Sequence, residues 1–261
     1  MTAAESDAVW RELRTTTQAR IGLGRAGDAL TTARLLEFGA AHAAARDAVH
    51  QALDVAPLTA RLEGLGLGAP VVVHSLATDR AQYLRRPDLG RRPADLSALE
   101  ALDAPADLAI VLADGLSSRA LAEHGAALLE ALLDRLPADV VVAPPVVALQ
   151  ARVALGDHIA HALGVRTVLV LIGERPGLSV ADSVGIDLTH RGDPADYAGG
   201  ITDADRNCIS NIHPPDGLDY ATAATVAAGL VTGARRLGRS GVDLKDTSRA
   251  ELDSPTVDAL S

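Results

Sequence analysis

Two polar segments in the second half of the chain carry side chains suited to holding a polar ligand. Glu174 and Arg175 stand in the segment Gly-Glu-Arg-Pro-Gly (173–177), directly after the apolar run 166–172. Such a run predicts a strand buried on both faces, and the glycines and proline predict that it stops there. Both charged side chains should therefore project from a stiff loop at a strand end, where they either bind a ligand or pair with each other.

The second segment is Arg-Asn-Cys-Ile-Ser-Asn-Ile-His (206–213), which is dense in hydrogen-bonding groups. Cys208 is the only cysteine of the chain, which excludes an intrachain disulfide and a cysteine-rich zinc site. A lone cysteine is usually a compact and inert side chain. Thiol catalysis together with His213 is the weaker hypothesis, because closeness in sequence does not establish contact in space.

Two glycine-containing motifs could bind phosphate groups. The spacing Gly-x-Gly-x-x-Gly at 22–27 would need a preceding strand to hold a dinucleotide, but the residues before it have a helical pattern. We therefore interpret it as a turn between two helices. The segment Asp-Gly-Leu-Ser-Ser (114–118) follows the apolar run 107–113 and precedes a helical pattern, so it is either a helix cap or an anion-binding loop.

Two clusters of basic or imidazole side chains also need an interpretation. His158 and His161 lie three residues apart on a predicted helix and could share a metal, but no third ligand is evident, so ordinary helix histidines are favoured. Five arginines crowd the irregular segment 80–92. This segment is either a solvated charged loop or part of a subunit interface, where arginine is favoured.

The elements that must position these residues alternate along the chain. Short apolar runs predict strands at 71–76, 107–113, 139–143 and 166–172. Helical patterns follow at 117–136, 150–163 and about 219–237. Strands that alternate with helices predict an α/β fold with a mostly parallel, Rossmann-like sheet flanked by helices.

Further helical patterns near the start of the chain, at about 7–20 and 32–54, predict an N-terminal helical segment over residues 1–60. The α/β domain that carries the polar segments is expected at 65–246. Residues 247–261 are expected to form a polar tail.

Composition excludes several classes of partner. A formal net charge of −10 and an aromatic content of 2% argue against binding to nucleic acid. No apolar run is long enough to span a bilayer, and the first residues lack the pattern of a secretory signal. We therefore expect a cytoplasmic protein that does not bind membranes.

Several motifs together resemble those of one protein family. They include Tyr-Leu-Arg-Arg-Pro-Asp-Leu-Gly-Arg-Arg (83–92), the segment 173–177, and Arg-Asn-Cys-Ile-Ser-Asn-Ile-His-Pro (206–214). With other matching stretches they occur in family order over about residues 19–246. The chain resembles the small subunit, or light chain, of ethanolamine ammonia-lyase.

The resemblance implies a carbon–nitrogen lyase in which this chain works with a large barrel subunit. That enzyme uses adenosylcobalamin to convert ethanolamine to acetaldehyde and ammonia by a radical mechanism. The corrin lies between the subunits, and ethanolamine binds mainly on the large one. We therefore expect no catalytic residue and no metal ligand in this chain.

The resemblance also implies three cobalamin contacts in this chain. Val153 is expected to pack against the corrin or its base, Glu174 to accept hydrogen bonds, and Cys208 to be a neutral contact. Some family members carry a long N-terminal extension linked to packaging in a bacterial microcompartment. The short leader before Ala19 favours the free cytoplasm instead.

We keep two alternative functions as hypotheses. A nucleotide-binding α/β oxidoreductase would rest on the alternating pattern and the glycines at 22–27. A scaffold subunit without any cofactor contact would rest on the resemblance alone. Loss of saturable NAD(P) binding in Gly24→Val would favour the first, and unchanged cobalamin affinity in Glu174→Ala would favour the second.

Overall fold

The computed structural model describes residues 3–102 and 105–248, and its centre is a six-stranded sheet. The strands are β1 (Val71–His74), β2 (Leu108–Ala113), β3 (Val146–Leu149), β4 (Thr167–Gly173), β5 (Val184–His190) and β6 (Arg206–Ile212). Their order across the sheet is β1-β3-β2-β4-β5-β6. β1, β3, β2 and β4 are parallel, whereas β5 and β6 add on as antiparallel neighbours. The predicted α/β class with a mostly parallel sheet is confirmed.

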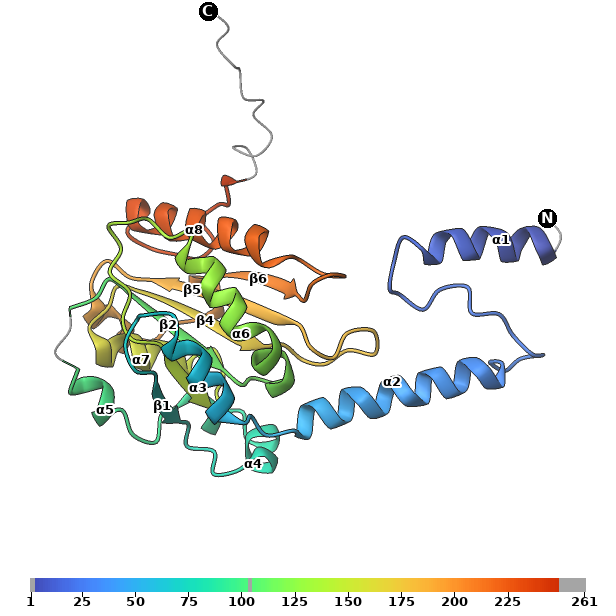
Figure 1. Ribbon diagram of the computed structural model, residues 1–261, viewed down its shortest axis with the longest axis horizontal. Coiled ribbons are helices and arrows are strands. Elements are labelled where there is room, and N and C mark those ends of the chain that lie inside the picture. Colours follow the sequence, from blue (N-terminus) through green and yellow to red (C-terminus); the bar gives the residue numbers. More distant parts are fainter. Residues whose placement is uncertain (1–2, 103–104, 249–261) are drawn as a thin grey trace, which may run out of the picture.

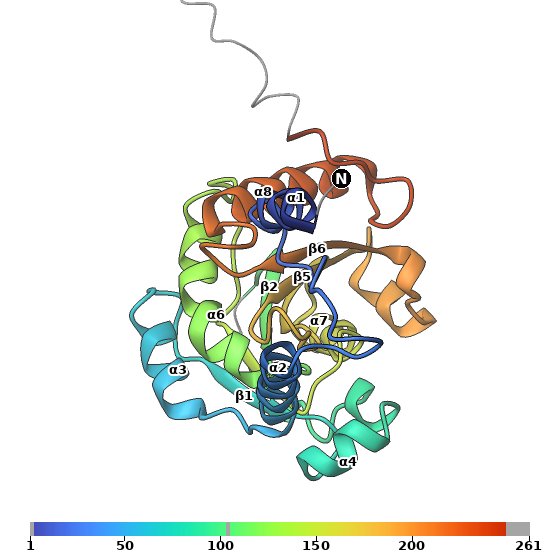
Figure 2. The same ribbon diagram turned by 90° about the vertical axis from the view of Figure 1, so that its right-hand side faces the viewer.

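Helices cover both faces of the sheet, as Figures 1 and 2 show. The α-helices are α1 (Ala3–Arg14), α2 (Thr32–His50), α3 (Val55–Glu63), α4 (Arg80–Arg85), α5 (Ser97–Glu100), α6 (Ser118–Leu133), α7 (Leu155–Leu163) and α8 (Tyr220–Leu237). Short 3-10 helices are η1 (Leu89–Arg91), η2 (Pro194–Gly199) and η3 (Asp203–Asp205). α3, α6 and α8 share one apolar core with the sheet, and α5 and α7 share a second core on the opposite face.

The central strand β2 shows why the sheet has two cores. All six of its residues are buried. Because successive side chains of a strand point to opposite faces, Leu108, Ile110 and Leu112 enter the core beneath α6 and α8. Ala109 and Val111 enter the core beneath α5 and α7. A continuous apolar run is what such a doubly covered strand requires.

One predicted strand is wrong, and three strands, β3, β5 and β6, were not predicted. Residues 139–143 run along the start of β2 and make only an isolated bridge, between Val142 and Leu108. The chain enters the sheet only after Pro144 and Pro145, where β3 forms. Polar side chains interrupt β5 and β6, so neither forms a continuous apolar run like those of β2 and β4.

Residues 3–50, here called the arm, project from the sheet domain (Figure 1). The glycines at 22–27 lie between α1 and α2, which confirms the predicted turn between two helices. Gly22, Gly24 and Gly27 all have positive φ, a conformation that favours glycine. At the other end of the chain, the predicted polar tail lies beyond Ser248 outside the described residues.

Candidate functional site

The face of β5 and β6 opposite α8 carries the polar side chains of the second sequence motif. Ile209 is buried in the core shared with α8, so its neighbours Cys208 and Ser210 point to the other face, where both residues are exposed. Asp187 of β5 is paired in register with Cys208. Asp187 is in turn paired with Val170 of β4. The three residues therefore stand side by side across three strands.

Glu174 lies at the carboxyl end of β4 and reaches across to β6. Its carboxylate accepts a short hydrogen bond from the Ser210 hydroxyl and a 3.1 Å bond from the backbone N–H of Asn211. A Cβ atom at Gly185 would lie 3.0 Å from a Glu174 carboxylate oxygen, so the glycine makes room for it. Pairing with Arg175, one of the two alternatives left open by the sequence, is not what fixes this side chain. β6 holds the carboxylate in place.

The Cys208 thiol shares this face with two carboxylates. Desolvation on the sheet face, together with the negative charges of Asp187 and Glu174, raises the pKa of Cys208 to about 12. Desolvation likewise raises the pKa of Asp187 to about 6, although Arg206 and the thiol of Cys208 oppose the shift. The thiol is therefore protonated at neutral pH, which disfavours a nucleophilic role because the thiolate is the reactive form.

Val153 lies in the loop between β3 and α7. It is half-buried, and its carbonyl accepts a 2.9 Å hydrogen bond from the N–H of Gly156. Gly156 packs so closely on β4 that an added Cβ would lie 2.4 Å from the Val170 side chain. Asp187 lies between Val170 and Cys208 in the sheet, so these two residues are two strand spacings, or roughly 10 Å, apart, and the start of α7 lies over Val170.

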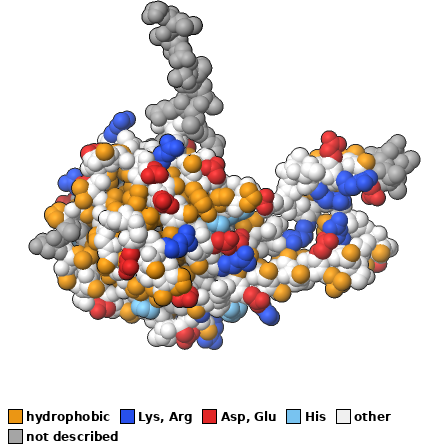
Figure 3. All heavy atoms as spheres, viewed as in Figure 1, with side chains coloured by type: hydrophobic (Ala, Val, Ile, Leu, Met, Phe, Trp, Pro, Cys, Tyr) orange, Lys and Arg blue, Asp and Glu red, His pale blue; other side chains and the backbone are white. Residues whose placement is uncertain are grey.

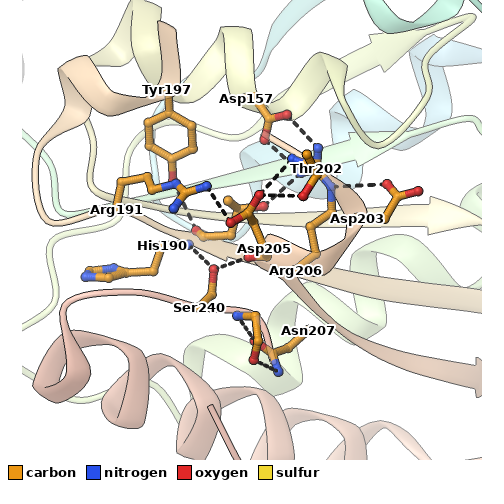
Figure 4. Close-up of polar contacts among 12 residues, drawn as sticks. Asp157, His190, Arg191, Tyr197, Thr202, Asp203, Asp205, Arg206, Asn207 and Ser240 are labelled. Carbon is orange, nitrogen blue, oxygen red and sulfur yellow. Dashed lines mark hydrogen bonds and ion pairs between the residues drawn. The ribbon is translucent and has the colours of Figure 1, made fainter. Parts of the chain in front are cut away.

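A buried ion pair joins the first turn of α7 to β6 (Figure 4). The Arg206 guanidinium donates to both carboxylate oxygens of Asp157, at 2.8 and 2.7 Å, and also to the Thr189 hydroxyl at 2.9 Å. Although burial opposes its charge, the hydrogen bonds to Asp157 raise the pKa of Arg206. This pair fixes the helix that follows Val153 against the strand that carries Cys208.

A second buried network shapes the loop that carries Val153. Asp114 is 1% exposed, and its carboxylate accepts hydrogen bonds from the backbone N–H groups of Gln150 and Ala151 at 2.9 and 3.0 Å. Gln150 has a φ of 53°, so the two amides converge on one carboxylate. The segment 114–118 also caps α6, because the Ser117 hydroxyl accepts from the N–H of Ala120. The helix-cap interpretation of this segment is confirmed.

Four arginines of the segment 80–92, at 85, 86, 91 and 92, are exposed, as the interpretation of a solvated loop predicts, and Arg80 is the exception. Its side chain is buried within the chain, donates to the Gly115 carbonyl at 2.7 Å, and lies 3.7 Å from the Asp114 carboxylate. It also lies over the ring of Tyr83, 4.8 Å from its centroid. Arg80 is therefore neither a solvated charge nor an interface residue. It supports the network behind the Val153 loop.

Sequence reasoning missed Asp157, Asp187 and the partner role of Arg206. Asp157 belongs to a predicted helix and Arg206 to a predicted polar segment, and 49 residues separate them. No spacing rule links them. The one signal for Asp187 is its place between apolar neighbours in Val-Gly-Ile-Asp-Leu (184–188), since a carboxylate at such a position needs a special environment.

One group of side chains has metal-ligand chemistry. Ligand atoms of Glu123, His124 and Asp182 lie within 4.8 Å of one another on the α6 side of the sheet. Arg119 pairs with Asp182 at 2.9 Å and with Glu123 at 3.6 Å, so a guanidinium already neutralises both carboxylates. His158 and His161 are not part of this group. Within the described ranges, no helix combines the length and apolarity needed to cross a bilayer.

Comparison with known proteins gives one consistent result. The family described as ethanolamine ammonia-lyase light chain (EutC) matches residues 7–245. The chain is 65% identical over 242 residues to the ethanolamine ammonia-lyase small subunit of Rhodococcus erythropolis, covering 93% of this chain and 91% of that protein. It is 49% identical to the small subunit of Xanthomonas campestris pv. campestris (strain ATCC 33913), with 94% and 89% covered. For Azotobacter vinelandii the identity is 48%, with 94% and 91% covered.

Proposed function

The chain belongs to the ethanolamine ammonia-lyase small-subunit family and is a subunit of a lyase, and from this premise we propose that it forms half of a cobalamin pocket. The other half is supplied by the large subunit, which also binds ethanolamine. The observation that supports the proposal is the face of β5 and β6 opposite α8, which carries Cys208 and holds the Glu174 carboxylate, and to which the Asp157–Arg206 pair fixes the helix that follows Val153.

The chemistry of this face fits a large ligand that is apolar in its body and carries amide side chains. A carboxylate offers about four lone-pair sites. Ser210 and Asn211 use part of that capacity at Glu174, which leaves acceptor positions for amide N–H groups of adenosylcobalamin. Cys208 adds a compact, neutral contact because its thiol keeps its proton. Val153 offers apolar surface for the corrin or its base.

These residues indicate what this chain contributes to the reaction and what the cofactor contributes. When bound, adenosylcobalamin supplies the radical that starts the conversion of ethanolamine to acetaldehyde and ammonia. The residues of this chain bind and orient the cofactor, and together with the large subunit they exclude water. In this proposal the chain holds no catalytic residue of its own. The cytoplasmic location expected from the sequence stays a prediction.

The rival oxidoreductase has less support. A dinucleotide site needs its glycine-rich turn between a strand and a helix, so that backbone amides meet the pyrophosphate. The glycines at 22–27 instead lie in the arm, between α1 and α2. A scaffold role without cofactor contact also has less support, because it would leave the polar groups around Glu174 without a ligand.

Reconstitution tests the proposal. Purified chain, large subunit, adenosylcobalamin and ethanolamine are combined, and acetaldehyde is followed. We expect activity only when this chain is present, and saturation as its concentration approaches that of the large subunit. Heat-unfolded chain is the control for nonspecific protection of the large subunit. Equal acetaldehyde production in the absence of this chain would contradict the proposal.

A further inference from the structure

The arm exposes apolar side chains that the rest of the chain does not cover. From residue 6 to residue 50, Ala48 is the one buried residue. Seven of the thirteen exposed large hydrophobic residues in the described part of the chain lie between residues 9 and 38. Among these seven residues, the most exposed are Leu36 at 68%, Leu35 at 57% and Val9 at 46%. In Figure 3 apolar side chains are visible along the arm.

The large apolar side chains of α2 lie along one broad side of the helix. Because successive residues of a helix are rotated by about 100°, Leu35, Leu36 and Phe38 fall within an arc of about 160°, and the opposite side carries alanines together with Arg34 and Glu37. The helix has 19 residues and is therefore about 28 Å long. A broad apolar side of this kind is typical of a helix that packs against other protein.

Polar contacts hold the arm in position without covering its apolar side chains. The Arg20 guanidinium donates to the Leu178 carbonyl at 2.9 Å, and the Ser179 hydroxyl donates to the Gln18 carbonyl at 3.0 Å. The Trp10 ring packs directly on Gly22, where an added Cβ would lie 2.3 Å from it. The arm is thus shaped in advance, which reduces the entropy that docking must overcome.

The arm lies on the same side of the molecule as the proposed cofactor face. Leu178 and Ser179 belong to the β4–β5 loop, which begins at Glu174. The end of α2 and this loop also line one groove, with His42 and Val49 on the helix side and Arg175 on the loop side. Figure 1 shows the β4–β5 loop pointing toward the arm. One partner can therefore contact the arm and close the cofactor face at the same time.

We propose that the arm is the main anchor of this chain in its complex, with the apolar side of α2 packed in a groove of the large subunit. The inference rests on the proposed function, which supplies the partner. A second copy of this chain is disfavoured because it would cover the arm without completing the cofactor pocket. Continuity with the face around Glu174 also favours the partner that completes the cofactor pocket.

The test compares two sets of substitutions in the full chain. One variant carries Leu35→Ser, Leu36→Ser and Phe38→Ser on α2. The control carries Val141→Ser and Leu237→Ser, which are 55% and 44% exposed at the opposite end of the sheet domain. Affinity for the large subunit is measured by calorimetry, self-association by sedimentation, and domain folding by urea unfolding.

We expect the α2 variant to bind the large subunit at least 100-fold more weakly than the natural chain, and the control variant to bind within threefold of it. Both should unfold at the natural urea midpoint. Equal affinity of the α2 variant would overturn the proposal. So would a loss of self-association with unchanged affinity for the large subunit, because that result assigns the arm to a second copy.

Failure of the proposed function gives a different result. If the natural chain does not bind the large subunit at all, both proposals fall together. If it binds the large subunit but adds nothing to the affinity for adenosylcobalamin, the cofactor-pocket proposal falls alone. If the arm alone is the anchor, the α2 variant at saturating large subunit keeps its natural affinity for adenosylcobalamin. A drop in cofactor affinity at saturation would place α2 in the pocket and contradict a purely anchoring role.

Discussion

The buried pair of Asp157 and Arg206 gives the sharpest test of how the candidate site is built. Their side chains are 9% and 5% exposed, and two hydrogen bonds of 2.7 and 2.8 Å join them. Asp157→Ala removes both bonds and leaves a buried guanidinium. What remains to Arg206 is the Thr189 hydroxyl at 2.9 Å and the exposed Asp203 carboxylate at 3.8 Å.

The contacts that remain to Arg206 determine how much the free energy of unfolding should fall. Breaking a buried ion pair by removing one partner typically costs about 3–5 kcal/mol. Because Thr189 still accepts one hydrogen bond, we expect Asp157→Ala to lie near the lower end, at about 3 kcal/mol. For a chain of this size that corresponds to a fall in Tm of about 6–12 °C. Urea unfolding at pH 7 measures the loss directly.

A double-mutant cycle separates the pair from its surroundings. Asp157→Leu combined with Arg206→Met replaces both charges with apolar groups, and such replacements are often close to neutral. We expect the double variant to recover at least half of the stability lost in Asp157→Ala. A loss below about 1 kcal/mol in Asp157→Ala, or a double variant as unstable as the sum of its parts, would refute the role assigned to this pair.

Three further predictions concern stability. Burial raises the pKa of Asp187 to about 6, so its ionisation weakens the folded state as pH rises from about 4 past 6. Asp187→Asn should remove that loss and stabilise the chain at pH 8, but not at pH 4, by at most about 3 kcal/mol in urea titrations. Gly115→Ala should lower the unfolding midpoint strongly, since φ is +55° and the new Cβ would lie 2.2 Å from a carbonyl oxygen, whereas Gly39→Ala should leave the domain's midpoint unchanged. Arg80→Met should cost about 2–4 kcal/mol in thermal unfolding by leaving a buried carboxylate without its cation, and Arg80→Lys should not restore it.

The sheet was predictable where a strand is apolar on both faces. β2 and β4 are continuous apolar runs, and their helices follow at the expected places. β5 and β6 escaped prediction because each has one face on the α8 core and the other on the polar site. The strand expected at 139–143 is wrong because apolar, β-branched residues occur both there and in β3. Composition alone does not determine which of the two segments hydrogen-bonds to the sheet.

The site was predictable only in part. Glu174 directly follows an evident strand, so its place at the sheet edge could be anticipated. Its fixation by Ser210 could not, because that contact depends on the register of two antiparallel strands. The pairing of Asp157 with Arg206 likewise depends on how α7 lies over the sheet. Local sequence patterns carry no information on either arrangement.

The arm shows the opposite relation between sequence and structure. Its helices were evident from residue spacing, yet the spacing does not reveal that α2 lies outside the domain. The large, exposed apolar side chains along one broad side of α2 indicate that this side packs against other protein. Within this chain that packing does not occur, and the proposed large-subunit groove resolves the conflict.

The affinity of the assembled complex for adenosylcobalamin tests the central proposal most directly. Glu174→Gln keeps the shape of the side chain and removes its charge, while Glu130→Gln makes the same change at an exposed position of α6. We predict that Glu174→Gln weakens cofactor binding by about 10-fold or more, as expected for hydrogen bonds to a charged group, and that Glu130→Gln has no effect. Equal affinity of the Glu174→Gln complex and the natural complex would show that this face does not hold the cofactor.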